Sequence, residues 1–165
     1  NSNLPGDIRI RKIEEVSTDF HSRFQAKSKI YRYSVLNQSY ASVFSRHTAY
    51  FYPHPLDIKL MRKEARVLLG RHNFRSFQTA DKKERDSVRM IKSIRIEKNG
   101  NMIHIDIEAD GFLYNMARNI AGTLIEIGRG RFPAGYMKRL LVAKDRRLAG
   151  PTLPAKGLCL IKVKY

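Results

Sequence analysis

The fold of this chain is decided by residues 90–128, which read MIKSIRIEKNGNMIHIDIEADGFLYNMARNIAGTLIEIG. The first half alternates apolar and polar residues on both sides of an Asn-Gly pair, which favours the positive φ angles of a tight hairpin turn. It therefore predicts antiparallel strands over 90–98 and 102–109. The second half places apolar residues at helical spacing, so it predicts a helix over about 113–127 that ends at Gly128.

The rest of the chain carries the same two periodicities on both sides of this stretch. Period-two patterns predict strands over 8–16, 29–36 and 158–165, and the 3.6-residue pattern predicts helices over 55–69 and 134–143. Strands dominate both ends of the chain and helices lie between them. The predicted fold class is therefore α+β, with a mostly antiparallel sheet and helices packed on one face.

Length and charge limit the possible functions. The 165 residues fit a single domain, residues 1–165, which is large enough to bury a core without disulfides or metals. The chain contains 32 Lys and Arg residues but only 15 Asp and Glu residues, which gives a formal net charge of +17. The electrostatic field of such a positively charged protein attracts a polyanion. Because the basic residues are scattered through folded segments, nucleic acid is favoured over a membrane surface or a merely soluble basic protein.

The cysteine content and the apolar runs bear on the cellular compartment. Cys159 has no second cysteine to pair with, which fits a reducing compartment, and its apolar neighbours predict a buried thiol on a strand. No apolar run reaches the ~20 residues that span a bilayer. The first residues have no charged leader or apolar signal core. These features predict a cytoplasmic protein.

Three segments interleave aromatic residues with arginine: 20–24 in a predicted loop, 29–33 on a predicted strand, and 72–77 after a predicted helix. Rings stack on unpaired bases and guanidinium groups bind phosphate, so such segments are typical of proteins that hold looped RNA. In the alternative interpretation, the phenylalanines are core residues and the arginines are solvated. No phosphate-binding glycine loop, serine elbow or metal-ligand spacing occurs, so neither a metal nor a cofactor is expected.

Arg118 is a separate candidate. An arginine on a helix usually lies at an exposed surface, but Arg118 is flanked by small and apolar residues in a segment that is otherwise poor in charge. A lone guanidinium group in such surroundings needs an anionic partner. We therefore expect Arg118 to pair with a negative group.

Six motifs follow one another along the chain. They are Phe-His-Ser-Arg-Phe at 20–24, Lys-x-Tyr-Arg-Tyr at 29–33, Leu-Leu-Gly-x-His-Asn-Phe-x-Ser-Phe at 68–77, Asp-Gly-Phe-Leu-Tyr-Asn-Met-Ala-Arg-Asn-Ile-Ala-Gly-Thr-Leu at 110–124, Ala-Gly-Pro-Thr-Leu-Pro-Ala at 149–155 and Gly-Leu-Cys-Leu at 157–160. Together they resemble the C-terminal part of the TruA family of tRNA pseudouridine synthases. The resemblance covers essentially the whole chain, from about Leu4 to Tyr165.

This resemblance implies a pseudouridine synthase type of catalytic-domain fold and an isomerase that converts uridine to pseudouridine in the anticodon stem-loop of tRNA. It implies no cofactor and no metal, and typically a homodimer. Tyr31 matches the family tyrosine that packs on the flipped base and assists the final proton removal. Arg118 matches the family arginine that pairs with the catalytic aspartate, which would supply its expected partner. The implied tRNA contacts are Phe20, His21, Ser22, Arg23, Phe24 and Arg85.

The catalytic aspartate itself is not recognisable in this sequence. In the family it lies in a Gly-Arg-Thr-Asp-Ala-Gly-Val-His-like motif, and no aspartate here has that context. We therefore expect that the N-terminal half with this aspartate is missing from the chain, and that the chain alone makes no pseudouridine. Two alternatives stay open: a stand-alone tRNA- or RNA-binding module without catalysis, and an unrelated basic α+β protein that binds RNA or ribosomes.

Overall fold

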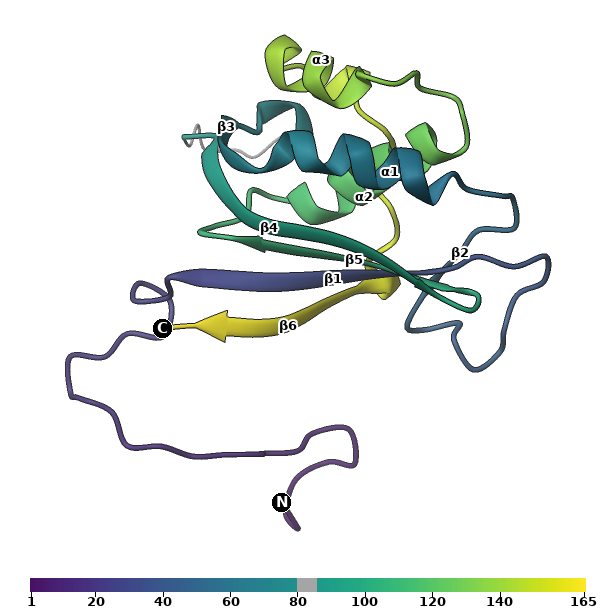
Figure 1. The fold of residues 1–165 in the computed structure, drawn as a ribbon. Helices are drawn as coiled ribbons and strands as arrows, with labels where there is room; N and C mark the ends of the chain where they lie inside the picture. Colours follow the sequence, from purple (N-terminus) through teal and green to yellow (C-terminus); the bar gives the residue numbers. More distant parts are fainter. Residues whose placement is uncertain (80–85) are drawn as a thin grey trace.

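The computed structural model describes residues 1–79 and 86–165 and shows a single sheet with the helices on one of its faces (Figure 1). The strands are β1 (Ser28–Leu36), β2 (Tyr50–Phe51), β3 (Gly70–Asn73), β4 (Val88–Asn99), β5 (Met102–Ala109) and β6 (Leu158–Lys164). The helices are α1 (Ile58–Ala65), α2 (Met116–Gly128) and α3 (Tyr136–Ala143). The predicted α+β class with helices on one face is confirmed.

The sheet is mixed but mostly antiparallel. Its strand order is β2-β1-β5-β4-β3, and β6 also pairs with β1. Among the described residues, only the short pairing of β1 with β2 is parallel. Because β6 lies beside β1, the end of the chain is joined to a strand near its beginning (Figure 1).

The central hairpin forms as predicted. β4 and β5 pair up to Asn99 and Met102, and Gly100 in the turn has a φ of +55°. Alternate side chains of a strand point to opposite faces. The isoleucines of β5 therefore all face the helices and are buried, whereas the polar residues between them face away: the buried residues are Ile103, Ile105 and Ile107.

Helix α2 lies in the centre of the core. Every residue from Met116 to Gly128 is buried except Arg118. A helix that is buried on all sides has apolar or small residues all round, and α2 is packed against α1 and β1. The guanidinium group of Arg118 is therefore carried by a helix whose other residues are all buried.

Carboxylates fix the starts of the other two helices. Asp57 precedes α1 and accepts a hydrogen bond from the Leu60 N–H at 2.9 Å, which caps the first turn. Glu64 is buried in α1 and accepts hydrogen bonds from the N–H groups of Gly135 and Met137, at 2.8 and 3.1 Å. These two groups belong to the first turn of α3, so Glu64 ties α3 to α1.

Two predictions from the sequence are wrong. Residues 8–16 form no strand; Ile8 and Ile10 alternate as a strand would, but no other strand lies beside them and both are about half exposed, at 49% and 48%. Cys159 is exposed instead of buried. It lies opposite Arg32 of β1, on the face of the sheet that the helices leave uncovered, so its apolar neighbours in sequence do not bury it.

The helix boundaries also differ from the predicted ones. α1 ends at Ala65 and is followed by a 3-10 turn over Arg66–Leu68. α2 begins only at Met116, because Asn115 has a left-handed backbone with a φ of 59°. No helix in the described part of the chain has both the length and the apolar character needed to cross a membrane.

Candidate active site

A cavity of about 420 Å³ opens between β1, residues 112–115 and the start of α2. Tyr31 and Arg118, the two predicted catalytic residues, both line it. Most of the remaining lining is aromatic or aliphatic and includes Phe112, Tyr114 and Leu158. A cavity that combines aromatic and aliphatic walls with polar groups is suited to a flat, partly polar ligand such as a nucleobase.

Tyr31 is placed by the sheet and by one aromatic contact. On β1 it pairs with Ile107 of β5 on one side and with Leu160 of β6 on the other. Its ring meets the ring of Phe112 edge to face, with centroids 4.9 Å apart and planes at 81°. Such a contact holds the ring in one orientation, while the half-buried side chain still reaches the cavity.

Arg118 is held by neutral acceptors. Its Nε donates to the Leu153 carbonyl at 2.6 Å, and its Nη1 donates to the side-chain oxygen of Asn115 at 2.8 Å. Within residues 1–79 and 86–165, no Asp or Glu forms an ion pair with it. The expected anionic partner of Arg118 is therefore not found among the described residues, and the guanidinium group keeps its charge facing the cavity.

The left-handed turn at Asn115 explains one of these two contacts. With its positive φ, Asn115 sits just before α2, three residues ahead of Arg118, and its side chain folds back to the guanidinium group. Asparagine is one of the few residues that adopt this conformation readily. Asn115 thus precedes the first residue of α2 and also orients Arg118, the one side chain of α2 that is not fully buried.

Tyr33 holds the residue next to Leu153. It is fully buried, and its hydroxyl donates to the Pro154 carbonyl at 2.7 Å. Burial raises the pKa of the Tyr33 phenol, and the nearby positive charge of Arg118 opposes this effect. Tyr33 therefore stays protonated and fixes the carbonyl that directly follows Leu153.

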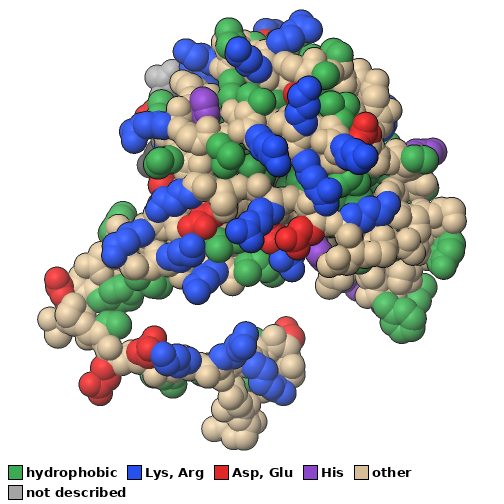
Figure 2. Space-filling view, viewed as in Figure 1, with side chains coloured by type: hydrophobic (Ala, Val, Ile, Leu, Met, Phe, Trp, Pro, Cys, Tyr) green, Lys and Arg blue, Asp and Glu red, His purple; other side chains and the backbone are tan. Residues whose placement is uncertain are grey.

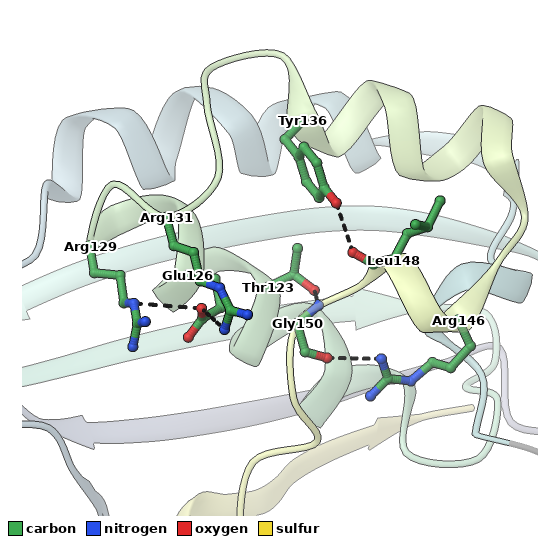
Figure 3. A network of polar contacts seen from close by, with 8 residues as sticks. All are labelled: Thr123, Glu126, Arg129, Arg131, Tyr136, Arg146, Leu148 and Gly150. Carbon is green, nitrogen blue, oxygen red and sulfur yellow. Dashed lines mark hydrogen bonds and ion pairs between the residues drawn. The ribbon is translucent and has the colours of Figure 1, made fainter.

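A polar network clamps residues 149–154 onto α2. Arg146 donates from Nη1 to the Gly150 carbonyl at 2.8 Å and from Nη2 to Asn119 and Thr152, both at 2.9 Å. The N–H of Gly150 in turn donates to the Thr123 hydroxyl at 3.0 Å (Figure 3). Burial lowers the pKa of Arg146. Since this network fixes the segment that contains Leu153, it also fixes the carbonyl that binds Arg118.

Two glycines allow this segment to touch α2 directly. A Cβ on Gly122 would lie 2.0 Å from the Pro151 carbonyl oxygen, and one on Gly150 would lie 2.7 Å from the Thr123 backbone. No side chain fits at either position, because backbone groups cannot move aside as the end of a flexible side chain can. The helix and the segment are therefore packed backbone to backbone.

We expect Gly122→Ala to lower the free energy of unfolding by about 3 kcal/mol, the upper end for an overpacked core site. The added methyl group must push the Pro151 carbonyl away and so disturb the clamp. Urea unfolding followed by circular dichroism measures the change. Gly6→Ala is the matched control, because nothing lies within 4 Å of its Cβ position. Equal unfolding midpoints for the two variants would show that the close approach does not constrain the fold.

The predicted RNA-contacting loop does not line the cavity. Phe20 packs against Tyr165 with centroids 5.0 Å apart, and His21 packs on Phe24 at 4.2 Å. Arg23 lies over the Phe24 ring at 5.7 Å, and Phe24 is 76% exposed. Ser22 is exposed as well, and none of the five residues lines the cavity. The sixth predicted contact, Arg85, lies outside the described residues.

The aromatic segment 72–77 has a structural role instead. Phe74 and Phe77 are fully buried in the core, so the alternative interpretation holds for them and their rings are not available to bases. Among the described residues, no group of three or more His, Cys, Asp or Glu side chains is placed to hold a metal ion.

Sequence reasoning did not assign a role to the residues that position Arg118. Asn115, Asn119 and Arg146 all belong to segments with a recognisable pattern, but nothing in the local sequence shows that they meet. Asn119 is the best example: it is fully buried on α2 and donates to the Phe77 carbonyl at 2.7 Å. A buried asparagine in an apolar helix is a feature that could have indicated such a network.

Comparisons with known proteins agree with the resemblance seen in the sequence. Residues 65–165 match the protein family described as tRNA pseudouridine synthase. The chain is 44% identical over its full length to tRNA pseudouridine synthase A of Geobacillus kaustophilus and covers 64% of that protein. It is 40% identical to tRNA pseudouridine synthase A of Acetivibrio thermocellus and 43% identical to tRNA pseudouridine synthase A 2 of Clostridium perfringens, covering 68% of each.

The chain thus spans about two thirds of the length of these relatives. The family match includes α2 with Arg118 and the clamped segment, and the similarity to whole relatives extends to β1 with Tyr31. On these grounds, the chain belongs to the TruA family of tRNA pseudouridine synthases.

Proposed function

We propose that this chain holds the target nucleotide of a tRNA pseudouridine synthase that acts on the anticodon stem-loop. The observation that carries the proposal is that Tyr31 and Arg118, far apart in sequence, line one cavity with both aromatic and polar walls. A uridine inside a folded stem-loop must be flipped out before its glycosidic bond can react, at a cost of a few kcal/mol of unstacking. The aromatic lining offers a stacking surface in return.

The reaction is an isomerisation and needs no external reactant. The bond between C1′ of the ribose and N1 of uracil breaks, the ring turns within the cavity, and C1′ bonds to C5. N1 then gains a proton and C5 loses one. In this scheme the Tyr31 ring packs on the base and its hydroxyl assists the loss of the C5 proton. Phe112 supports the scheme, because its edge-to-face contact keeps the tyrosine ring in place.

Arg118 would orient and keep ionised the aspartate that starts the reaction. We propose that this aspartate comes from outside the 165 residues. Asp110 is the aspartate nearest to the cavity in sequence, but its side chain is engaged elsewhere: its Oδ1 accepts a hydrogen bond from the Met90 N–H at 2.9 Å and the residue is exposed. The positive charge of Arg118 at the cavity is suited to an incoming carboxylate.

A second function is a tRNA-binding module without catalysis. It is favoured by one observation, that no carboxylate in the described part of the chain pairs with Arg118. Both functions require tRNA binding through the basic surface and through the loop formed by residues 20–24, with Arg85 as a further predicted contact. Dimerisation of the full-length protein is likewise a prediction that rests on the family.

We expect the 165-residue chain to bind an anticodon stem-loop, with an affinity that falls steeply between 50 and 200 mM salt, but to form no pseudouridine. The full-length protein should form pseudouridine in the same RNA. Pseudouridine is measured by tritium release from uridine labelled at C5. Pseudouridine formed by the chain alone would contradict the external aspartate, and binding that does not depend on salt would contradict the basic RNA-binding surface.

A further inference from the structure

The side-chain amide of Asn115 points in a defined direction. An arginine carries only donors, so Asn115 must turn its oxygen toward Nη1 of Arg118, and the two atoms are 2.8 Å apart. The NH2 group of the same amide then points the other way and needs an acceptor of its own. The hydroxyl of Thr79 supplies it, with Oγ1 at 3.2 Å from Nδ2 of Asn115.

Thr79 is placed for this contact from two sides. Its backbone N–H donates to the Tyr114 carbonyl at 3.1 Å, which holds the residue beside the turn before α2. From α2, Nδ2 of Asn119 donates to the Phe77 carbonyl at 2.7 Å. The same Nδ2 also donates to the Thr79 hydroxyl at 3.3 Å. Because a threonine oxygen accepts two hydrogen bonds, the amides of Asn115 and Asn119 use its full capacity as an acceptor.

The hydroxyl of Thr79 determines whether the Asn115 amide stays in place. Within residues 1–79 and 86–165, this hydroxyl is the only acceptor bonded to Nδ2 of Asn115. An amide NH2 group that faces a methyl group instead loses its hydrogen bond, and it regains one by turning toward water. That movement takes the amide oxygen away from Arg118, which then keeps only its contact with the Leu153 carbonyl.

We infer that Thr79 is a positioning residue for the reaction: its hydroxyl fixes the Asn115 amide, and the amide fixes the direction of the Arg118 guanidinium group. Thr79 does not line the cavity, so it acts only through Asn115. Nη2 of Arg118 has no acceptor in the described part of the chain and is available to a carboxylate that enters the cavity. Donors of this kind stabilise charge only while their direction is fixed. The inference rests on the proposed function, in which Arg118 orients the catalytic aspartate.

The test uses neutral substitutions in the full-length protein. Thr79→Val removes the hydroxyl and keeps the branched shape, whereas Thr79→Ser keeps the hydroxyl. Thr48→Val is the matched control, because Thr48 is exposed in the loop between β1 and β2. Figure 2 shows that Lys and Arg side chains are spread over the visible face of the molecule. Since none of the variants changes a charge, electrostatic attraction of RNA is the same in all of them.

We expect Thr79→Val to lower kcat for pseudouridine formation about 10- to 100-fold, a loss typical of the hydrogen-bond partners that hold the reactive groups of a site in place. KM should stay within about twofold, because the cavity lining and the charges are unchanged. Thr79→Ser should restore most of the turnover, and Thr48→Val should behave as wild type. Tritium release measures both kinetic parameters.

A double-mutant cycle tests whether Thr79 acts through Asn115. Asn115→Gly removes the amide, and glycine adopts the φ of 59° at this position readily. In that background Thr79 has no amide left to orient, so Thr79→Val should change kcat by less than about twofold. Circular dichroism confirms that the variants are folded at the assay temperature. If the valine variant is unfolded, Thr79→Ala takes its place with the same expected losses.

A loss in kcat of less than about fivefold in Thr79→Val would overturn the inference. The same holds for a full loss on top of Asn115→Gly, which would show that Thr79 acts through another group, and for a serine variant as slow as the valine variant. A rise in KM alone would assign Thr79 to RNA binding and would also contradict the positioning role. Failure of the proposed function is distinguishable, because the wild-type full-length protein would then form no pseudouridine at all.

Discussion

Replacement of Arg118 by lysine is expected to lower kcat for pseudouridine formation about 100- to 1,000-fold, similar to the loss of one preorganised donor in an active site. Lysine keeps the charge but has no planar fork. It cannot hold the Leu153 carbonyl and the Asn115 oxygen while also presenting a donor to a carboxylate in the cavity. Tritium release from tRNA by the full-length protein measures the effect.

The control for Arg118→Lys is Arg139→Lys on the exposed side of α3, which should change kcat by less than about twofold. Stability has to be measured for both variants, because Arg118→Lys leaves one buried acceptor unpaired at a cost of about 1–2 kcal/mol. The protein should still be folded at assay temperature. If Arg118→Lys kept kcat within tenfold of wild type, no catalytic carboxylate would depend on this guanidinium group.

Replacement of Tyr31 by phenylalanine should lower kcat by about 10²- to 10⁴-fold and leave KM within a few-fold, because only the proposed proton-transferring hydroxyl is lost. The ring and its contact with Phe112 remain. Tyr31→Ala should in addition raise KM by about 10-fold or more, since base stacking contributes roughly 1–3 kcal/mol. Steady-state kinetics on a tRNA transcript separate the two parameters.

Tyr40→Phe is the matched control, because Tyr40 lies in an exposed loop and is 69% exposed. It should behave as wild type. Normal turnover by Tyr31→Phe together with poor turnover by Tyr31→Ala would restrict Tyr31 to stacking and assign the proton transfer to another group.

Local sequence patterns predicted correctly those elements whose formation depends mainly on the local sequence. The hairpin is an example, since Asn-Gly sets the turn and alternation sets which face is buried, and both hold in the structure. The strand predicted over 8–16 shows the limit. The alternation at Ile8 and Ile10 indicates only that these two side chains could share a face. A strand also needs a neighbouring strand with which its backbone can pair. The exposure of Cys159 has the same origin, because it depends on which side of the sheet the helices cover.

The candidate site was predictable only in part. Tyr31 and Arg118 were named from a family pattern, and the structure places both at one cavity. What holds Arg118 in place could not be read from the sequence. Asn119, Arg146 and the Leu153 carbonyl meet through a clamp between segments that are distant along the chain. Each partner looks like an ordinary polar residue or a backbone group until the fold brings them together.

The backbone contact between Gly122 and Pro151 also has a consequence for the time at which the cavity forms. During translation, α2 leaves the ribosome well before residues 149–154 do. Until those residues arrive, the Thr123 hydroxyl lacks Gly150, the Asn119 side chain lacks Arg146, and Arg118 lacks its carbonyl. β1 must likewise wait for β6. The cavity is therefore complete only after residues 149–160 have emerged, whereas the β4–β5 hairpin has all of its residues well before that point.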